Sequence, residues 1–127
     1  MSGTDFLADT NALIYLLSGN ECMRPYLGAR FFVSCITEME LLSYPDIKPA
    51  DEAMAKELLA CCAPVELSQE IKEGAIALRR QYRLRLPDAI VAASAQARQI
   101  PLLTADKVFL RVAAIETALL QPAAPGQ

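Results

Sequence analysis

Residues 86–97 have the sequence LPDAIVAASAQA. Alanine has the highest helix propensity, and Pro87 suits the first turn of a helix, where its missing N–H would have no partner. The segment is apolar on almost every face, which is typical of a buried helix. Asp88 falls in the first turn, where a carboxylate opposes the positive end of the helix, so its simplest interpretation is a helix cap. The rest of the chain decides whether this carboxylate has others near it.

Short apolar segments alternate with helical ones along the 127 residues. This alternation predicts a parallel sheet with helices on both faces, and a hydrophobic content of 54% agrees with a sheet buried on both sides. We expect one domain over residues 1–120 and a disordered tail over 121–127. The expected strands are 6–8, 31–35, 65–67, 101–103 and 115–120, and the expected helices are 12–17, 37–42, 49–59, 69–82 and 86–97.

The charge balance and the residue types exclude some classes of protein. Twelve basic and fifteen acidic residues give a net charge of −3, which argues against binding nucleic acid through overall positive charge. The sequence has no histidine, and its four cysteines lack C-x-x-C spacing, so a zinc site would have to be all-cysteine. No apolar run is long enough to span a bilayer and residues 1–5 carry no basic signal region, so we expect a cytoplasmic protein without membrane contact.

Four acidic residues lie at expected element junctions. Asp9 follows the first strand, Glu40 lies in the helix after the second, Asp88 opens the buried helix and Asp106 follows the strand at 101–103. Each has a simpler explanation, because Thr37 and Glu40 match a capping box, and Asp9 and Asp106 could cap the helices that follow them. Ligands of parallel sheets, however, bind beyond the carboxyl ends of the strands, where these acids would gather.

Such a gathering of carboxylates points to metal chemistry. Carboxylates within a few ångströms raise each other's pKa values unless a positive partner is present. Mg²⁺ and Mn²⁺ prefer oxygen ligands, and a water with a metal-lowered pKa can attack phosphorus without a histidine base. The pattern therefore predicts metal-dependent hydrolysis of phosphodiesters. Glu38 is the alternative to Glu40 as the acid of this helix. Side chains two positions apart on a helix face different sides, so only one of the two can face the other acids, and the motif spacing favours Glu40.

Four short motifs follow one another over nearly the whole chain: D-T-N at 9–11, T-x-x-E-L at 37–41, P-D-A-x-x-A-A-x-A at 87–95 and L-T-x-D-x-x-F at 103–109. None is specific alone, but the set in this order resembles PIN-domain ribonucleases, in particular VapC toxins of VapBC toxin–antitoxin modules. The resemblance implies a three-layer α/β/α sandwich, RNA cleavage that depends on Mg²⁺ or Mn²⁺, a homodimer and inhibition by a cognate antitoxin.

The resemblance also implies roles for the matched residues. Asp9, Glu40, Asp88 and Asp106 would bind the metal, and Thr10, Asn11 and Thr104 would form hydrogen bonds around them. The fourth acidic position is the most variable one in the family pattern, which allows Asp106 to act through a water.

A cluster of arginines precedes Asp88. Arginine binds phosphate oxygens bidentately and tyrosine can stack on a base, so this cluster predicts an RNA contact in an otherwise acidic protein. A solvated helix face and a docking site for acidic groups of an antitoxin are the alternatives. Under the RNA hypothesis, replacing Arg80 or Arg83 with alanine weakens RNA binding or cleavage. The cluster contains Arg79, Arg80, Tyr82, Arg83 and Arg85.

Three other classes of function were weighed. A response-regulator receiver domain needs a second acid beside the first and a phosphoacceptor aspartate ending a central strand, and neither is placed here. A phosphatase of the haloacid dehalogenase type needs an acid where Asn11 stands. A catalytically silent PIN-like binding module would keep the fold without the chemistry, and the presence of all four acids argues against it.

Overall fold

The computed structural model describes residues 4–124, in which five strands form one sheet. The strand order is β3-β2-β1-β4-β5, and every neighbouring pair is parallel. This arrangement confirms the predicted α/β class with a central parallel sheet. The strands are β1 (Asp5–Ala8), β2 (Arg30–Ser34), β3 (Ala63–Val65), β4 (Leu102–Thr104) and β5 (Thr117–Leu119). The helices are α1 (Thr10–Leu17), α2 (Cys35–Leu42), α3 (Pro49–Ala60), α4 (Gln69–Tyr82) and α5 (Leu86–Arg98), with 3₁₀ segments η2 (Glu21–Tyr26) and η3 (Lys107–Arg111).

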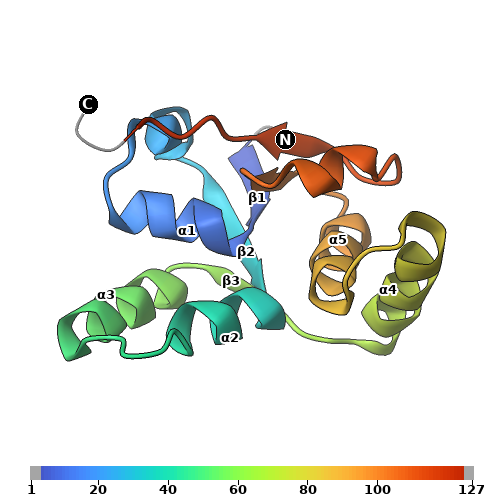
Figure 1. Cartoon of the computed structure of the whole chain (residues 1–127), viewed down its shortest axis with the longest axis horizontal. Coiled ribbons are helices and arrows are strands. Elements are labelled where there is room, and N and C mark those ends of the chain that lie inside the picture. The colour runs from blue at the N-terminus through green and yellow to red at the C-terminus, as the bar shows by residue number, and fades with distance from the viewer. Residues whose placement is uncertain (1–3, 125–127) are drawn as a thin grey trace.

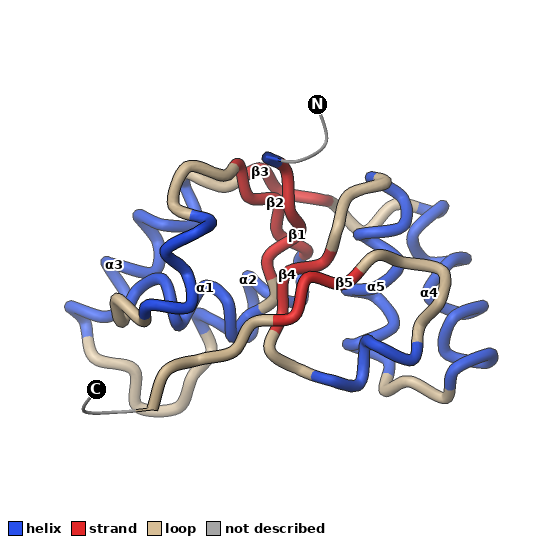
Figure 2. Tube along the Cα trace, turned by 90° about the horizontal axis from the view of Figure 1, so that it is seen from above, coloured by secondary structure: helices blue, strands red, loops and turns tan. Residues whose placement is uncertain are grey.

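The sheet lies between two groups of helices. Seen from above, its strands form a column with α1 and α3 on one side and α4 and α5 on the other (Figure 2). The view in Figure 1 shows the same division, with α2 below β2 and beside α3. The three layers of an α/β/α sandwich are therefore present, as expected.

Two apolar clusters hold these layers together, one on each face of the sheet. Successive side chains of a strand point to opposite faces, so Phe32 packs with α4 and α5 while Phe31 and Val33 pack with α1, α2 and α3. The predicted buried helix is α5, whose residues 91–95 are all buried. It packs against α4, where Gly74 brings the two backbones close opposite Ala93.

Some element boundaries differ from the predictions. The third strand is Ala63–Val65 and not 65–67, because it lies at the edge of the sheet, where the missing N–H of Pro64 costs no sheet hydrogen bond. Cys35 starts α2 instead of ending β2, since Ser34 already caps that helix. The last strand is confined to Thr117–Leu119.

The chain end predicted to be a tail is tied to η2 in its described part. Asn20 donates a hydrogen bond to the carbonyl of Ala123 at 3.2 Å and accepts one from the Ala123 N–H at 3.1 Å. The remainder of the predicted tail, 125–127, lies outside the described residues. Within residues 4–124, none of the helices has the length and hydrophobicity that crossing a bilayer requires.

Candidate active site

A cavity of about 770 Å³ lies beyond the carboxyl ends of β1 and β4, at the place where parallel sheets bind ligands. Its walls come from the start of α1, the second half of α2, the loop between α2 and α3, and the start of α5. All four acids singled out in the sequence line it, from four different elements: Asp9, Glu40, Asp88 and Asp106. The fold thus brings together residues that are up to 97 positions apart in the chain.

Asp9 is the buried member of this group. It is the N-cap of α1, where its Oδ1 accepts a hydrogen bond from the Thr10 N–H at 2.9 Å. The buried Thr104 hydroxyl donates to its Oδ2 at 2.7 Å. Asn11 lies close by and donates to the same oxygen at 3.4 Å and to the Thr104 hydroxyl at 3.3 Å. These contacts fix the carboxylate at the end of β1.

The same network fixes the position of Asp106. The Asn11 side-chain carbonyl accepts from the Ala105 N–H at 3.0 Å, and the Thr104 hydroxyl accepts from the Asp106 N–H at 3.0 Å. The Asp106 carboxylate caps η3 by accepting from the Val108 N–H at 3.0 Å. The predicted capping roles of Asp9 and Asp106 are confirmed, and both residues still line the cavity.

Glu40 and Asp88 are not caps, which corrects the simpler explanation of each. Ser34 caps α2 by accepting from the Thr37 N–H, so Thr37 is inside the helix, and Glu40 Oε1 instead accepts from the Thr10 hydroxyl at 2.6 Å. Asp88 is the third residue of α5, because the helix begins at Leu86. Its Oδ2 lies 3.6 Å from Nε of the exposed Arg85. Glu38, the competitor of Glu40, is not among the cavity-lining residues.

The electrostatics of the cavity favour a positive partner for its acids. Burial raises the pKa of Asp9 above its usual value, the hydrogen bonds from Thr104 and Thr10 partly offset this, and the charges of Glu40 and Asp88 add to it. Burial also raises the pKa of Asp88, which Arg85 lowers and the charges of Asp106 and Glu40 raise. A cation among these carboxylates would stabilise their charged forms.

The donor chemistry suits a hard divalent cation, since the acids offer only carboxylate oxygens and the neighbouring groups are hydroxyls and an amide. The acidic side chains are, however, spaced more widely than in a ready-made metal site. Among residues 4–124, no three acidic or cysteine side chains come close enough together to form a ready-made metal site. The four acids therefore surround the cavity without converging on one point.

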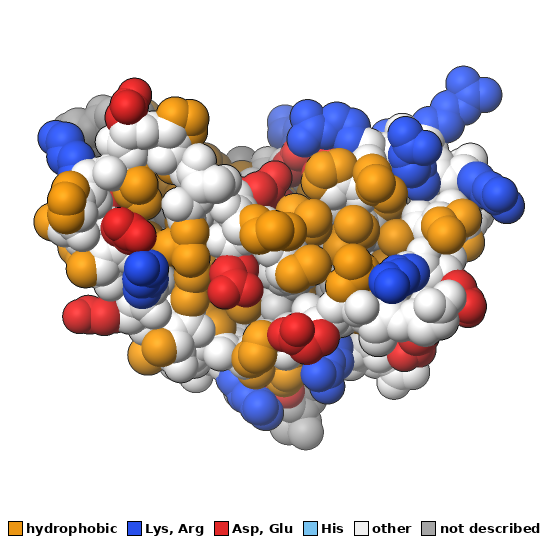
Figure 3. All heavy atoms as spheres, turned by 90° about the horizontal axis from the view of Figure 1, so that it is seen from below, with side chains coloured by type: hydrophobic (Ala, Val, Ile, Leu, Met, Phe, Trp, Pro, Cys, Tyr) orange, Lys and Arg blue, Asp and Glu red, His pale blue; other side chains and the backbone are white. Residues whose placement is uncertain are grey.

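The arginines of the predicted RNA contact lie along the α4–α5 connection. Arg85 lines the cavity, and Arg79, Arg80 and Arg83 are exposed. Arg83 ends α4 in the left-handed conformation, with φ 56°. Viewed from below, Lys and Arg side chains gather on the side of the molecule that α4 and α5 form, and acidic side chains lie near the middle of the same face (Figure 3). Tyr82 is half-buried against the apolar cluster beneath α4 and α5.

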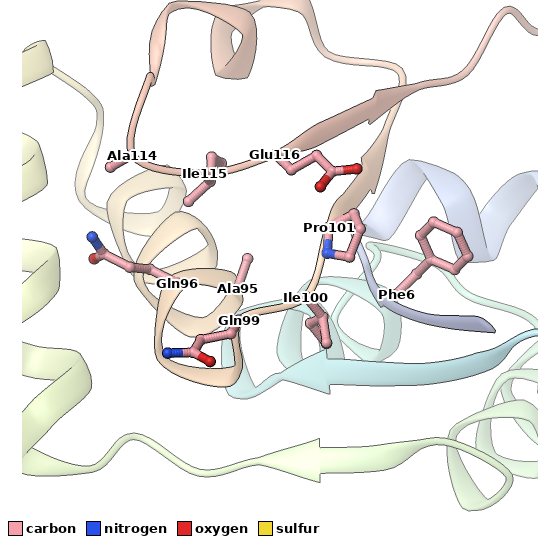
Figure 4. Close-up of a pocket in the computed structure, with 9 residues that line it drawn as sticks. All are labelled: Phe6, Ala95, Gln96, Gln99, Ile100, Pro101, Ala114, Ile115 and Glu116. Carbon is pink, nitrogen blue, oxygen red and sulfur yellow. The ribbon is translucent and has the colours of Figure 1, made fainter. Parts of the chain in front are cut away.

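A second cavity, of about 550 Å³, lies at the opposite edge of the sheet. Figure 4 shows its lining, in which Glu116 is the one carboxylate and Gln96 and Gln99 provide amides at the end of α5. It does not share a residue with the cavity of the four acids. The acid-lined cavity is therefore the candidate active site.

A comparison with known families gives a match over most of the chain. The model of the PIN domain matches residues 6–115, which span all of the motifs and most of the sheet. The chain belongs to the PIN domain family. Membership removes the receiver and phosphatase alternatives and confirms the family resemblance of the sequence motifs.

Several solved structures similar to this PIN domain come from toxin–antitoxin complexes. A chain of a toxin–antitoxin complex from Klebsiella pneumoniae is 34% identical, with 87% of this chain and 94% of that chain covered and a TM-score of 0.76. VapBC2 from Rickettsia felis, bound to a DNA fragment from its promoter, is similar in fold at 17% identity, with 92% and 99% coverage and a TM-score of 0.80. DNA-bound VapBC from Salmonella typhimurium is similar in fold at 20% identity, with 90% and 96% coverage and a TM-score of 0.79. No protein with a curated description matches the chain in sequence.

Sequence reasoning missed one wall of the PIN-domain cavity. The segment 43–48, which joins α2 to α3, lines the cavity together with Asp51. In the sequence, Tyr44 and Pro45 appear only as the stop of the helix that carries Glu40. Their position directly after that helix is the signal that could have placed them near the acids.

Proposed function

We propose that this PIN domain is an endoribonuclease that depends on Mg²⁺ or Mn²⁺ and is the toxin of a toxin–antitoxin pair. The observation that carries the proposal is the single cavity at the carboxyl edge of the sheet, lined by all four acids. The 34% identity to a chain of a toxin–antitoxin complex supports the toxin role.

In this proposal Asp9, Glu40, Asp88 and Asp106 hold the metal. When bound, the ion supplies Lewis-acid chemistry, which is positive charge beside a phosphate and a more acidic water. The chain's own residues prepare the site. Thr104, Thr10 and Asn11 hold Asp9 with its oxygens fixed, and the Thr10 hydroxyl holds Glu40 toward α1.

The basic residues at and near the cavity would bind the RNA substrate. Arg85 lines the cavity beside Asp88, where its guanidinium can bind a phosphate oxygen of RNA. Arg79, Arg80 and Arg83, with Tyr82 beside them, would extend the RNA contact away from the cavity.

The partners of the toxin role are part of the same proposal. We expect a cognate antitoxin protein, because the similar structures are VapBC complexes. We also expect a homodimer that acts in the cytoplasm, where its RNA substrates are.

A catalytically silent PIN module is the second candidate. The observation that favours it is that no three acids among the described residues form a ready-made metal site. Such a module would bind an antitoxin or RNA without cleaving it.

RNA cleavage by the wild type and by Asp9→Asn and Asp88→Asn tests the two candidates. With Mg²⁺ or Mn²⁺ we expect the wild type to cut RNA and both variants to lose about 100-fold or more in rate. EDTA should stop the wild type. Asp5→Asn is the matched control, because Asp5 begins the strand that Asp9 follows and does not line the cavity.

The results separate the candidates cleanly. Wild-type cleavage that persists in EDTA, or variants as active as the wild type, would refute the proposed metal site. A folded wild type that cuts no RNA with either metal would favour the silent module. Circular dichroism of each variant shows that a loss of rate is not a loss of folding.

A further inference from the structure

The acid-lined cavity has a wall that the proposed metal chemistry does not use. This wall is the segment 43–48 between α2 and α3, and its most exposed large side chain is Tyr44, which is 68% exposed. Pro45 and Ile47 add apolar surface beside it. The ring of Tyr44 thus lines the cavity without being needed for packing of the core.

The backbone of this wall is fixed by a turn. The carbonyl of Tyr44 accepts from the Ile47 N–H at 3.1 Å, and Asp46 between them is in the left-handed region, with φ 63°. The turn is joined to a helix at each end. The Ser43 N–H donates to the Met39 carbonyl of α2, and Pro49 starts α3. The backbone of Tyr44 is therefore held at a defined place in the cavity wall.

The charges of the cavity decide what kind of group this wall accepts. Six carboxylates line the cavity against two cations, and the wall or its neighbourhood contributes two of the six, Asp46 and Asp51, and one of the cations, Lys48. The wall therefore carries one more negative than positive charge, which disfavours a phosphate there. A neutral nucleobase would not be repelled, and its amino groups could donate to the same carboxylates. Its π-face would stack on the tyrosine.

We propose that Tyr44 stacks on a nucleobase of the RNA next to the scissile phosphate and so determines where the chain is cut. The proposal rests on the proposed ribonuclease function. It gives the two sides of the cavity different tasks, since Arg85 and the acids act on the phosphate while the segment 43–48 binds the base. Tyr82, the tyrosine of the predicted RNA contact, is half-buried and packs against the apolar cluster of α4 and α5.

Kinetics with Tyr44→Ala and Tyr44→Phe test this inference. We expect Tyr44→Ala to raise KM for a short RNA by about 10-fold with a smaller change in kcat, and to broaden the set of cleavage sites. Tyr44→Phe keeps the ring and should behave like the wild type. Leu110→Ala, which removes a side chain that is 55% exposed outside the cavity, is the control for a general surface effect.

A second readout does not need catalysis. A short RNA with 2-aminopurine next to the mapped cleavage site should lose fluorescence on binding to the wild type or Tyr44→Phe in EDTA, because stacking quenches this base. Tyr44→Ala should bind without that quenching.

The outcomes separate this inference from the proposed function. If the wild type cuts RNA and Tyr44→Ala leaves KM, the cleavage sites and the quenching unchanged, the stacking role alone is overturned. A Tyr44→Ala variant that cuts like the wild type but escapes a protein inhibitor would also overturn it and make Tyr44 a protein contact. A wild type that cuts no RNA, but whose binding quenches 2-aminopurine placed at some position of a short RNA, would refute the nuclease and leave the base site standing.

Discussion

Thr104 is the residue on which the geometry of the site depends most. Its hydroxyl is fully buried, donates to Asp9, and accepts from the Asp106 N–H and from Asn11. Replacing it with valine keeps the shape, but it leaves the Asp106 N–H without its acceptor and Asp9 Oδ2 with only the longer hydrogen bond from Asn11. We expect Thr104→Val to lower the free energy of unfolding by about 1–3 kcal/mol, measured by urea denaturation.

The same substitution should change the pH dependence of cleavage. The hydrogen bond from Thr104 lowers the pKa of Asp9, so its loss raises a pKa that burial already holds above the usual value. Asp9 would then become charged only at higher pH, and the acid limb of the pH–rate profile should move upward. Thr117→Val, which removes a hydroxyl bonded to the Phe109 carbonyl, is the control. An acid limb that does not move in Thr104→Val would show that Asp9 does not need to be charged for cleavage.

At this scale the sequence singled out four acids that the fold brings to one cavity, but it described only two of their local roles correctly. Capping was the simpler explanation for all four, and the structure shows it for Asp9 and Asp106 but not for Glu40 and Asp88. The reason is that a cap depends on where the preceding element ends. Ser34 and Thr37 are both suitable caps, and only the pairing of β2 in the sheet decides that the helix begins after Ser34.

At the scale of elements, the start of α2 links stability to the site. The Ser34 hydroxyl caps α2, which carries Glu40, by accepting from the Thr37 N–H at 3.2 Å. Ser68 caps α4 in the same way through the Ile71 N–H at 3.2 Å, and α4 carries none of the four acids. We expect Ser34→Ala and Ser68→Ala each to cost about 1 kcal/mol in thermal or urea unfolding.

The two variants should differ in activity. Fraying of the first turn of α2 moves Glu40, so Ser34→Ala should lower the cleavage rate at temperatures where it is fully folded, while Ser68→Ala should not. Equal rates in both variants would mean that Glu40 is not positioned by the start of α2.

The elements themselves could be predicted well, because helix and strand periods differ clearly in this chain. The helix expected at 69–82 is α4 with the same bounds, and Ser68 is its N-cap. The edge strand was misplaced because a proline normally argues against a strand, and only the sheet order shows that Pro64 lies at an edge. The wall at 43–48 was missed, since its position directly after the Glu40 helix is the only sequence signal for it and its approach to the acids also depends on how α2 and α3 pack.

On the scale of the whole molecule, an acidic protein must bring a polyanion to a cavity lined by carboxylates. The net charge of −3 opposes this, and the arginines beside the cavity would provide a local attraction. Each arginine that contacts a phosphate releases counterions, which makes RNA binding weaken as salt rises.

Salt titrations of RNA binding therefore test the arginine patch. In EDTA, where no cleavage occurs, we expect Arg80→Ala and Arg83→Gly to weaken binding of a short labelled RNA and to reduce the slope of log K against log salt by about 0.7 each. Glycine is used at position 83 because the backbone there has φ 56°. Lys72→Ala is the matched control, because Lys72 is an exposed cation on α4 two turns before Arg79. If the slopes of both arginine variants equal that of the wild type, these arginines are a solvated surface, and RNA must be bound through other cations, such as Arg85 at the cavity.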